Sequence, residues 1–518
     1  MALFELVIAL LLAGALLAIL ARRIGVPYPA LLALAGAIAA IVPGTPVVML
    51  DPELALALFV APTLLDAAFD ASPRDMRDNW LPIGALAIIV VGITVAAVAM
   101  VAHAIVPAMS WPACIALGAI VAPPDASAAI AVLRQLNPPH RVLVILEGES
   151  LFNDATALLI YRLAVAAAAG GSVGGWELIP VLALTVGGAV VLGWLAARLW
   201  LRLPLDQGDI PVFVLIQFLG TFAIWILAQR LGVSAIITVV VYAITLARWA
   251  PKRSHARARI ASYAVWEVVV FVLNVLAFVL IGLQLKAIFG RLDGGWAVYV
   301  GTAAAICLVV ILVRIAWVMP YNVALRWKLG RFGDGGGRRL ARPTFGSGVV
   351  ISWCGMRGIV TLATALALPA DFGHRDLIVF CAFWVVLGTL ALQGLTLRPL
   401  MQRLLLPVDN SVAEEIRLAR STTARAAIDA LQERGDTNSV ALLRREYAAR
   451  VSGGAELPSD AERLPGLQRH LVSIQRRVLF RLRRDGTIGD DAFHAIEEEL
   501  DILDLAADPR IRTLDGPD

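Results

Sequence analysis

Thirteen apolar runs, separated by short polar loops, fill the chain from its first residues to about residue 400. A helix needs about 20 apolar residues to cross the roughly 30 Å hydrocarbon core of a bilayer. The runs therefore predict an all-α polytopic membrane protein with thirteen transmembrane helices, some of them short. The predicted spans are 3–20, 27–42, 54–70, 80–106, 111–133, 142–169, 178–197, 211–229, 232–248, 263–284, 295–319, 346–368 and 376–400.

The pattern changes after Arg403, where apolar residues recur at helical spacing among many charged ones. Four such segments cover residues 411–434, 438–451, 462–484 and 490–507. They predict a transmembrane domain over residues 1–403 and a cytoplasmic helical tail over 404–518. The tail is either a solvated helical appendage or a regulatory domain, and its sequence leaves both interpretations open.

The composition of the 518 residues agrees with this division. Apolar residues make up 59%, charged residues 16%, and the mean hydropathy is +0.79, whereas a soluble domain has about 25% charged residues. A disordered chain and a soluble enzyme are excluded. The four cysteines lie in apolar segments and the six histidines are scattered. We therefore expect no disulfide framework, resident metal or cofactor.

Basic residues alternate from loop to loop and indicate an orientation. Loops on one side carry 19 Lys and Arg, and loops on the other side carry four. The positive-inside rule makes the first side cytoplasmic, with the N-terminus outside and the tail inside, as an odd number of spans requires. We expect a multi-pass protein of the inner cell membrane. The cytoplasmic set is Arg22, Arg23, Arg74, Arg77, Arg134, Arg141, Arg198, Arg202, Arg248, Lys252, Arg253, Arg257, Arg259 and the six basic residues from Arg326 to Arg342.

The fifth and twelfth predicted spans contain residues that interrupt a helix. Pro123 and Pro124 remove two helical hydrogen bonds in the middle of a span, directly before Asp125. Four glycines in 346–358 favour unwinding of the twelfth span around Arg357. Inside a membrane, freed backbone groups are tolerated only where they are buried in protein or line a polar cavity.

The two interrupted spans hold equivalent positions, because each is fifth in a set of six, spans 1–6 and spans 8–13. The sets are offset by seven spans, so they run through the membrane in opposite directions and form predicted inverted repeats. Paired interrupted helices in two inverted halves indicate a substrate site near the middle of the membrane in a secondary transporter.

Eight ionisable residues lie within the predicted spans, although a charge at the bilayer centre costs about 2.5–3.5 kcal/mol. So many charges indicate both structural ion pairs and a transport site. The eight are Asp66, Asp125, Glu147, Glu149, Asp154, Glu267, Arg314 and Arg357.

The sixth span is the richest in such residues. At helical spacing Glu147, Ser150 and Asp154 share one face, and Glu149 and Asn153 share another. We expect Asp154 and Ser150 to line a cavity for a monovalent cation, because carboxylate and hydroxyl oxygens are hard ligands.

The remaining charges are assigned to pairing or to the edge of this site. We expect Glu149 to form a structural ion pair with Arg357 of the unwound span. Glu147 either shares that pair or lies at the cytoplasmic mouth, and the spacing leaves both open. Asp66 follows a proline in the third span and is expected to reach the cavity, and Arg314 is a further accessory candidate.

The motif G-E-S-x-x-N-D, ending at Asp154, closely resembles the signature helix of the monovalent cation:proton antiporter family, which includes NhaP-type and animal sodium/proton exchangers. Other landmarks of that family follow in order over about residues 1–400, and the Pro-Pro-Asp-Ala variant and the tail look most like a bacterial YjcE-like branch. The landmarks are Ala61–Ala67, similar to L-P-P-x-L-[DE]-A/G; Asp125–Leu133, similar to D-P-V-A-V; Trp266–Gly282, similar to W-E…N…F…G; and Gly355–Gly358, similar to G-L-R-G.

The resemblance implies a homodimer in which a core domain, with crossed broken helices 5 and 12, moves against a dimer domain. It assigns cation and proton binding to Asp154, with Asp125, Ser150 and Asp66 as neighbours, and the structural ion pair to Glu149 and Arg357. Asn153, beside the binding aspartate, is the family's mark of electroneutral one-for-one exchange.

The chain departs from the family pattern around Asp125. The family usually has Thr or a small residue before this aspartate and Pro after it, whereas Pro124 precedes it here and Ala126 follows. A possible hydroxyl or altered carbonyl ligand is lost, so the family's cation selectivity does not carry over.

We therefore expect a secondary antiporter, not an enzyme, that exchanges Na+ for H+ by alternating access in pH and sodium homeostasis. The alternatives are K+/H+ or broad-specificity exchange, with Li+ included, and, more remotely, a cation channel or an intramembrane enzyme. The channel lacks a T-V-G-Y-G-like filter and the enzyme lacks an H-E-x-x-H or G-x-S-x-G motif. The expected partners are the two ions, the lipid bilayer and a second copy of the chain, and no nucleic acid.

Overall fold

The computed structural model describes residues 2–43, 51–170, 178–203, 209–249, 255–290, 296–332, 343–404, 406–407, 409–432, 438–451 and 465–506. Within these ranges every regular element is a helix and there is no strand, which confirms the all-α fold class. Residues 252–253 and 338–342 of the basic loops lie outside the described residues.

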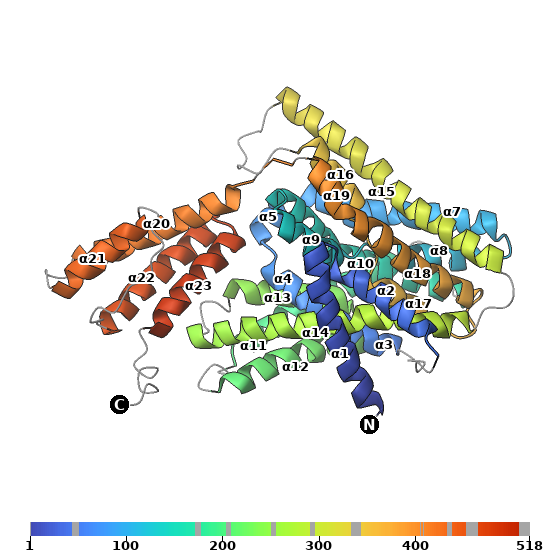
Figure 1. Cartoon of the computed structure of the whole chain (residues 1–518), viewed down its shortest axis with the longest axis horizontal. Helices are drawn as coiled ribbons and strands as arrows, with labels where there is room; N and C mark the ends of the chain where they lie inside the picture. Colours follow the sequence, from blue (N-terminus) through green and yellow to red (C-terminus); the bar gives the residue numbers. More distant parts are fainter. Residues whose placement is uncertain are drawn as a thin grey trace.

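The helices follow one another along the chain as labelled in Figure 1. Their order up to residue 404 is α1 (Ala2–Ile24), α2 (Tyr28–Ile41), α3 (Pro52–Ala55), η1 (Leu56–Val60), α4 (Ala61–Asp70), α5 (Pro73–Asp78), α6 (Trp80–Gly84), η2 (Ala85–Val90), α7 (Val91–Ile105), α8 (Trp111–Val121), α9 (Ala126–Leu133), η3 (Arg134–Leu136), α10 (His140–Ala168), α11 (Leu178–Trp200), α12 (Ile210–Arg230), α13 (Ala235–Trp249), α14 (Ala256–Phe289), α15 (Trp296–Phe332), α16 (Phe345–Trp353), α17 (Ile359–Leu366), α18 (Arg375–Thr389), η5 (Leu390–Gly394) and α19 (Leu395–Leu404).

Nine helical stretches in the described part of the chain are long and apolar enough to cross a membrane. The helices α2 and α13 are apolar but shorter. This is the architecture of a multi-pass membrane protein, and the number of thirteen spans stays a prediction. The nine stretches are Pro52–Asp70, Trp80–Ile105, Trp111–Leu133, His140–Ala168, Ala183–Trp200, Ile210–Arg230, Ala256–Phe289, Trp296–Arg331 and Arg375–Leu404.

Small residues allow the bundle helices to pack closely. A Cβ on Gly282 of α14 would lie 2.3 Å from the carbonyl oxygen of Ala33, and a Cβ on Gly36 of α2 would lie 2.4 Å from that of Val279. The backbones of α2 and α14 therefore touch at this point. Such contacts hold membrane helices together, because lipid supplies no hydrophobic force between them.

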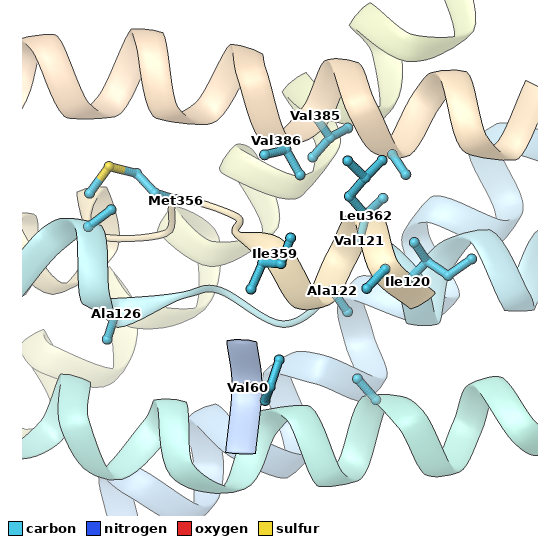
Figure 2. Close-up of a cluster of buried hydrophobic side chains, with 14 of the residues drawn as sticks. Val60, Ile120, Val121, Ala122, Ala126, Met356, Ile359, Leu362, Val385 and Val386 are labelled. Carbon is cyan, nitrogen blue, oxygen red and sulfur yellow. The ribbon is translucent and has the colours of Figure 1, made fainter. Parts of the chain in front are cut away.

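Two helices are interrupted where the sequence predicts it. The helix α8 ends at Val121 and α9 begins at Ala126, on either side of the two prolines. The helix α16 ends at Trp353 and α17 begins at Ile359. Figure 2 shows the two unwound segments next to each other among buried apolar side chains that include residues of η1, α8, α9, α17 and α18.

The tail consists of four helices that match the four amphipathic segments of the sequence. They lie to one side of the bundle in Figure 1 and pack around two apolar clusters of their own, one including Phe493 and the other Tyr447. The boundary between the two predicted domains stays a prediction. The tail helices are α20 (Ser411–Gln432), α21 (Asn438–Val451), α22 (Pro465–Arg484) and α23 (Asp490–Ala506).

Candidate functional site

The two unwound segments contact each other directly. The backbone N–H of Asp125 donates to the carbonyl oxygen of Met356 at 2.6 Å. The carboxyl of Asp125 lies very close to Gly358. A Cβ atom added to Gly358 would be 1.8 Å from Oδ2 of Asp125. Only glycine fits at this position. The second glycine of the G-x-R-G sequence therefore lets the Asp125 carboxyl approach the backbone of the twelfth span, in addition to favouring its unwinding.

Arg357 satisfies the carbonyls that the breaks leave without helical partners. Its Nε donates to the carbonyl oxygen of Val121 at 2.9 Å, and its Nη2 to that of Ala122 at 3.0 Å. Its Nη1 also donates to the carbonyl of Gly355. These groups form the carboxyl ends of α8 and α16, where helix dipoles carry partial negative charge. One buried guanidinium thus stabilises both ends.

Asp125 has the complementary position at the amino ends of the other two half-helices. It is the N-cap of α9, where its Oδ1 accepts from the backbone N–H of Ser127 at 2.9 Å. It also touches Gly358, the residue that precedes α17. The partial positive charge of a helix amino end favours a carboxylate. The arrangement therefore holds a negative charge beside two helix dipoles near the middle of the bundle.

Asn153 and Asp154 bring α10 to the same place. The side-chain amide of Asn153 donates to the carbonyl oxygen of Pro124 at 2.9 Å, so it contacts the fifth-span break directly. Asp154, next to it, is 8% exposed, and the charge of Asp125 acts on its carboxyl. Among the described residues, no basic side chain forms an ion pair with Asp154. The structure thus brings together Asp125, Asn153 and Asp154 of the predicted set.

The predicted ion pair between Glu149 and Arg357 is wrong. Both carboxylate oxygens of Glu149 accept from Arg314 of α15, at 2.5 and 2.8 Å, and both side chains are 2% exposed. Arg314 also donates to the carbonyl oxygen of Ile351 at 3.0 Å, so the pair ties α10 and α15 to α16. Because backbone carbonyls already satisfy Arg357, the second buried arginine takes the glutamate.

The other two residues of the predicted set on α10, Glu147 and Ser150, are less deeply buried. Glu147 pairs with Arg134 at 3.3 Å, where the Arg134 side chain is exposed. It does not share the buried pair, and the other alternative, a position at the mouth of the bundle, agrees with this contact. Ser150 is half-buried one turn before Asp154 on α10, and its part in a binding site stays a prediction.

Asp66 lies in a separate cavity. This cavity of about 70 Å³ lies between α4, α11, α12, α13 and α14, and its lining includes Asp70, Tyr263 and Trp266 but neither Asp125 nor Asp154. The charged groups that act on Asp66 are Asp70, Arg134 and Glu267. The structure therefore does not bring Asp66 together with the paired aspartates, and its role as a cation ligand stays a prediction.

Two contacts at the site were missed from the sequence. The sequence predicts Arg314 only as an accessory charge, although an arginine in the middle of an apolar run indicates a buried acidic partner. Thr389 of α18 accepts from the backbone N–H of Arg357 at 3.1 Å and so fixes the twelfth-span break. Nothing in the sequence distinguishes this threonine, because many threonines lie on membrane helices.

The chemistry of this site is that of carboxylate oxygens in a low-dielectric surrounding. Across the described residues, no group of three or more His, Cys, Asp or Glu is arranged to hold a metal ion. Two carboxylates without a fixed cation suit a weakly held monovalent ion or a proton, since either one neutralises a buried charge.

Comparison with known proteins places this geometry in a family. The family described as sodium/hydrogen exchanger, transmembrane, matches residues 7–403. The uncharacterized Na+/H+ exchanger Rv2287 of Mycobacterium tuberculosis is 32% identical, over 96% of this chain and 95% of its own. The exchanger YjcE of Escherichia coli, also uncharacterized, is 28% identical over 88% of this chain and 89% of its own.

A further relative and a solved structure extend this comparison. The sodium, potassium, lithium and rubidium/H+ antiporter of Bacillus pumilus is 30% identical over 79% of this chain and 62% of its own. The sodium proton antiporter MjNhaP1 of Methanocaldococcus jannaschii at pH 8 has a TM-score of 0.57, with 19% identity over 77% of this chain and 98% of its own. At that identity the likeness shows the fold alone.

Proposed function

The chain belongs to the sodium/hydrogen exchanger family, and from this premise we propose that it exchanges a monovalent cation, foremost Na+, for H+. It is a membrane transporter of cations and protons and not an enzyme. The observation that carries the proposal is the buried Asp154, which lies within reach of the charge of Asp125 and has no basic partner among the described residues.

The mechanism we propose is competition at the Asp154 carboxyl. A carboxylate removed from water is costly when it is charged and alone, so the site binds either a proton or a cation. Each ion excludes the other, and each neutral, loaded form crosses between the two sides by alternating access. Exchange then needs no ATP, because the gradient of one ion drives the other.

Electroneutral, one-for-one exchange follows if Asp154 alone changes its occupancy. Asn153 carries no charge and its amide is engaged by the carbonyl of Pro124. Asp125 is fixed by the N–H of Ser127 and lies beside Gly358. In this proposal these fixed groups position the site, and Ser150 and Asp66 are further cation ligands along the path.

The assembly and placement of the protein are part of the proposal. We propose thirteen spans with inverted repeats, in a homodimer whose core domain moves against the dimer domain. The fold likeness to MjNhaP1 supports the helical arrangement, and the homodimer rests on the family resemblance. The alternation of basic loops supports a cytoplasmic tail, an external N-terminus and the inner cell membrane.

The choice of cation is the least determined part. The loss of the usual residues around Asp125 removes the family's guide to selectivity, and one relative is named for four cations, sodium, potassium, lithium and rubidium. Broad-specificity or K+/H+ exchange is therefore the second candidate. It predicts that K+ and Rb+ drive proton flux as well as Na+ and Li+ do.

The test is proton flux in proteoliposomes, followed with a pH-sensitive dye from pH 6 to 9 while each of the four cations is added. We expect dequenching with at least Na+, at a rate that an imposed membrane potential leaves unchanged. Asp154→Asn should abolish the response, whereas Asp371→Asn, at an exposed loop carboxylate, should retain it. Full exchange in Asp154→Asn, or a potential-driven cation current, would overturn the mechanism.

A further inference from the structure

The tail contacts the membrane helices at two places, through α13 and α14 and through α5 and α10. On one side, Arg259 of α14 pairs with Asp501 of α23, with 2.8 Å between Nε and Oδ2, and lies 3.6 Å from Glu497. Arg483 of α22 donates to the carbonyl oxygen of Ala247 in α13 at 3.1 Å. The tail is thus attached to the helices that line the Asp66 cavity.

On the other side, the tail is attached to α5 and to the start of α10. Arg74 of α5 pairs with Glu415 of α20 at 3.0 Å, and Glu415 also accepts from the backbone N–H of Gly489 at 2.5 Å. Asp409, just before α20, accepts from the backbone N–H of His140 at 3.0 Å. The helix α10 carries Asp154, so the tail bridges the site helix and the pair α13–α14.

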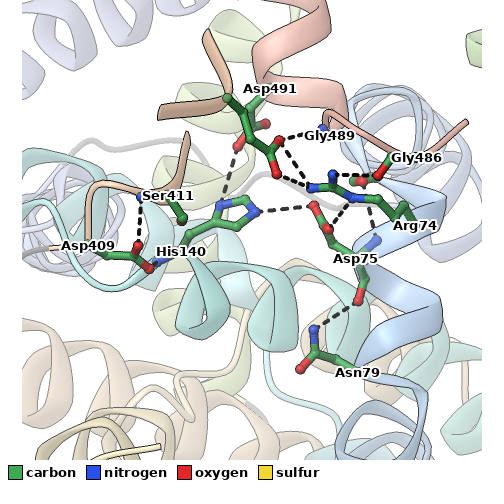
Figure 3. Close-up of polar contacts among 11 residues, drawn as sticks. Arg74, Asp75, Asn79, His140, Asp409, Ser411, Gly486, Gly489 and Asp491 are labelled. Atoms are coloured by element: carbon green, nitrogen blue, oxygen red, sulfur yellow. Dashed lines mark hydrogen bonds and ion pairs between the residues drawn. The ribbon is translucent and has the colours of Figure 1, made fainter. Parts of the chain in front are cut away.

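His140 lies at the centre of this second attachment, between two carboxylates. Its Nε2 is 3.2 Å from Oδ2 of Asp75 in α5, and its Nδ1 is 3.3 Å from Oδ2 of Asp491 in α23. Figure 3 shows the ring between these two groups. One carboxylate belongs to the membrane part and the other to the tail.

The two contacts together favour a protonated ring. A neutral imidazole has one N–H donor and one acceptor nitrogen, whereas carboxylates only accept, so only the imidazolium can donate to both. Without the proton, one ring nitrogen faces a carboxylate with no hydrogen between them. Asp75 and Asp491 then repel each other through a neutral ring.

The other charged groups nearby make the ring the one that changes state at neutral pH. Burial raises the pKa of Asp75, but hydrogen bonds from His140 and Arg74 outweigh it and hold that pKa at about 2, so Asp75 stays ionised. Glu147 of α10 also acts on the ring. A cavity of about 670 Å³, lined by His140, Asp75 and Asp491 with Asp78, Glu414 and Glu415, gives water access to the ring.

We propose that His140 is a proton-operated latch that fastens the tail helix α23 to α5 and α10. The protonated ring holds the latch closed, and loss of the proton at alkaline pH releases Asp491 from the bundle. Resting on the proposed antiport function, the closed latch slows exchange, because it ties the helix of Asp154 to α13 and α14. Release at high pH then speeds proton entry.

The latch is tested by a distance that does not depend on transport. Spin labels at Arg77→Cys and Glu498→Cys, both exposed positions on α5 and α23, are placed in the full chain with Cys307→Ser, since Cys307 is the half-buried native cysteine. We expect a short, narrow distance distribution at pH 6 that lengthens and broadens by pH 9. With His140→Gln added, the distribution should be long and broad at both pH values. A label-to-label distance that does not change with pH in the chain that keeps His140 would overturn the proposal.

Matched variants separate the latch from general damage. Asp491→Asn removes the tail carboxylate and should also give the long form at pH 6. Asp485→Asn is its control, because the side chains of Asp485 and Asp491 are 51% and 52% exposed and, among the described residues, Asp485 pairs only with its neighbour Arg484. His470→Gln, at an exposed position on α22, is the control for His140→Gln. Wild-type behaviour of both His140→Gln and Asp491→Asn would contradict the latch.

Exchange in the same proteoliposomes tests the regulatory consequence. His140→Gln and Asp491→Asn should raise the rate several-fold at pH 6–7 and leave it unchanged at pH 9, whereas the two controls keep the wild-type profile. A pH-dependent distance with unaltered exchange profiles would overturn the inhibitory role and leave a docking contact. No exchange under any condition would overturn the antiport proposal, and the distances would still decide the latch.

Discussion

Glu149 and Asp154 lie five residues apart on α10, and both are buried carboxyls in an apolar bundle. Glu149 is held by Arg314 through two hydrogen bonds, and the pair links three helices. Asp154 is 8% exposed, is acted on by the charge of Asp125, and has no basic partner among the described residues. A buried charge with a permanent partner, such as Glu149, has a structural role. A buried charge without such a partner is available to bind an exchangeable ion.

The largest expected effect comes from removing the unpaired charge. Asp154→Asn should bring exchange to the background of protein-free liposomes, because the amide binds neither a proton nor a cation in place of the other. The unfolding temperature in detergent should stay the same or rise, since no buried carboxyl has to be neutralised. Proton flux and thermal unfolding are measured on one preparation. A lower unfolding temperature for Asp154→Asn would indicate that Asp154, like Glu149, has a structural role.

The paired charge should behave in the opposite way. Glu149→Gln leaves Arg314 as a buried charge without a counter-ion, so the free energy of unfolding should fall by about 3–5 kcal/mol. Thermal unfolding in detergent measures the loss, and exchange per folded molecule should persist.

The double variant Glu149→Gln with Arg314→Met is the control for this prediction. It removes both charges, so it should recover most of the stability that the single variant loses. If the double variant is no more stable than the single one, the ion pair stabilises the fold by more than the neutralisation of its two charges.

Arg357 is expected to belong with the structural charges, with a smaller effect. Arg357→Lys keeps the charge but loses the planar fork that reaches carbonyls of both half-helices. We expect a loss of about 1.5–3 kcal/mol in thermal unfolding, together with slower exchange because Asp125 is displaced.

Arg375→Lys provides the matched control. Arg375 also donates to two carbonyls, those of Leu366 and Leu368, but it is half-buried at the start of α18. Its replacement should change neither exchange nor stability by more than about 0.5 kcal/mol. Equal losses in the two variants would remove the special role of Arg357.

A last prediction tests the comparison outside the membrane, at the buried carboxyl of Asp75. Its pKa of about 2 lies below the ordinary 3.8, so its pairing stabilises the fold above about pH 4 and is lost as the pH falls towards 2. Asp75→Asn should lower stability by about 2 kcal/mol at pH 7. The difference from the wild type should shrink at pH 3, and thermal unfolding at the two pH values measures it. A constant difference would show that the aspartate contributes packing and not charge.

Much of the fold was predictable because it depends on local chemistry. The apolar runs and the four amphipathic tail segments predict their helices, since each depends on neighbours within a few turns. The two prolines before Asp125 predict a break at their own position. The motif around Asp154 indicates the family, which the comparison over residues 7–403 confirms.

The pairing of charges was not predictable in this way. The sequence shows Glu149, Arg314 and Arg357 as buried charges, but many pairings satisfy the same spacing. The freed carbonyls of Val121 and Ala122 decided the outcome, because they occupy Arg357 and leave Arg314 for the glutamate.

The sequence by itself determined the helices, the two breaks and the motif of the site, because these depend on residues close together in the chain. Only the tertiary structure decided that Arg357 caps two half-helices, that Asp66 lies apart from Asp154, and that His140 joins Asp75 to Asp491 of the tail. Each of these features depends on contacts between side chains or backbone groups that are far apart in the sequence. Helical periodicity sets the direction of a side chain about its own axis, and the packing of whole helices sets what lies in that direction.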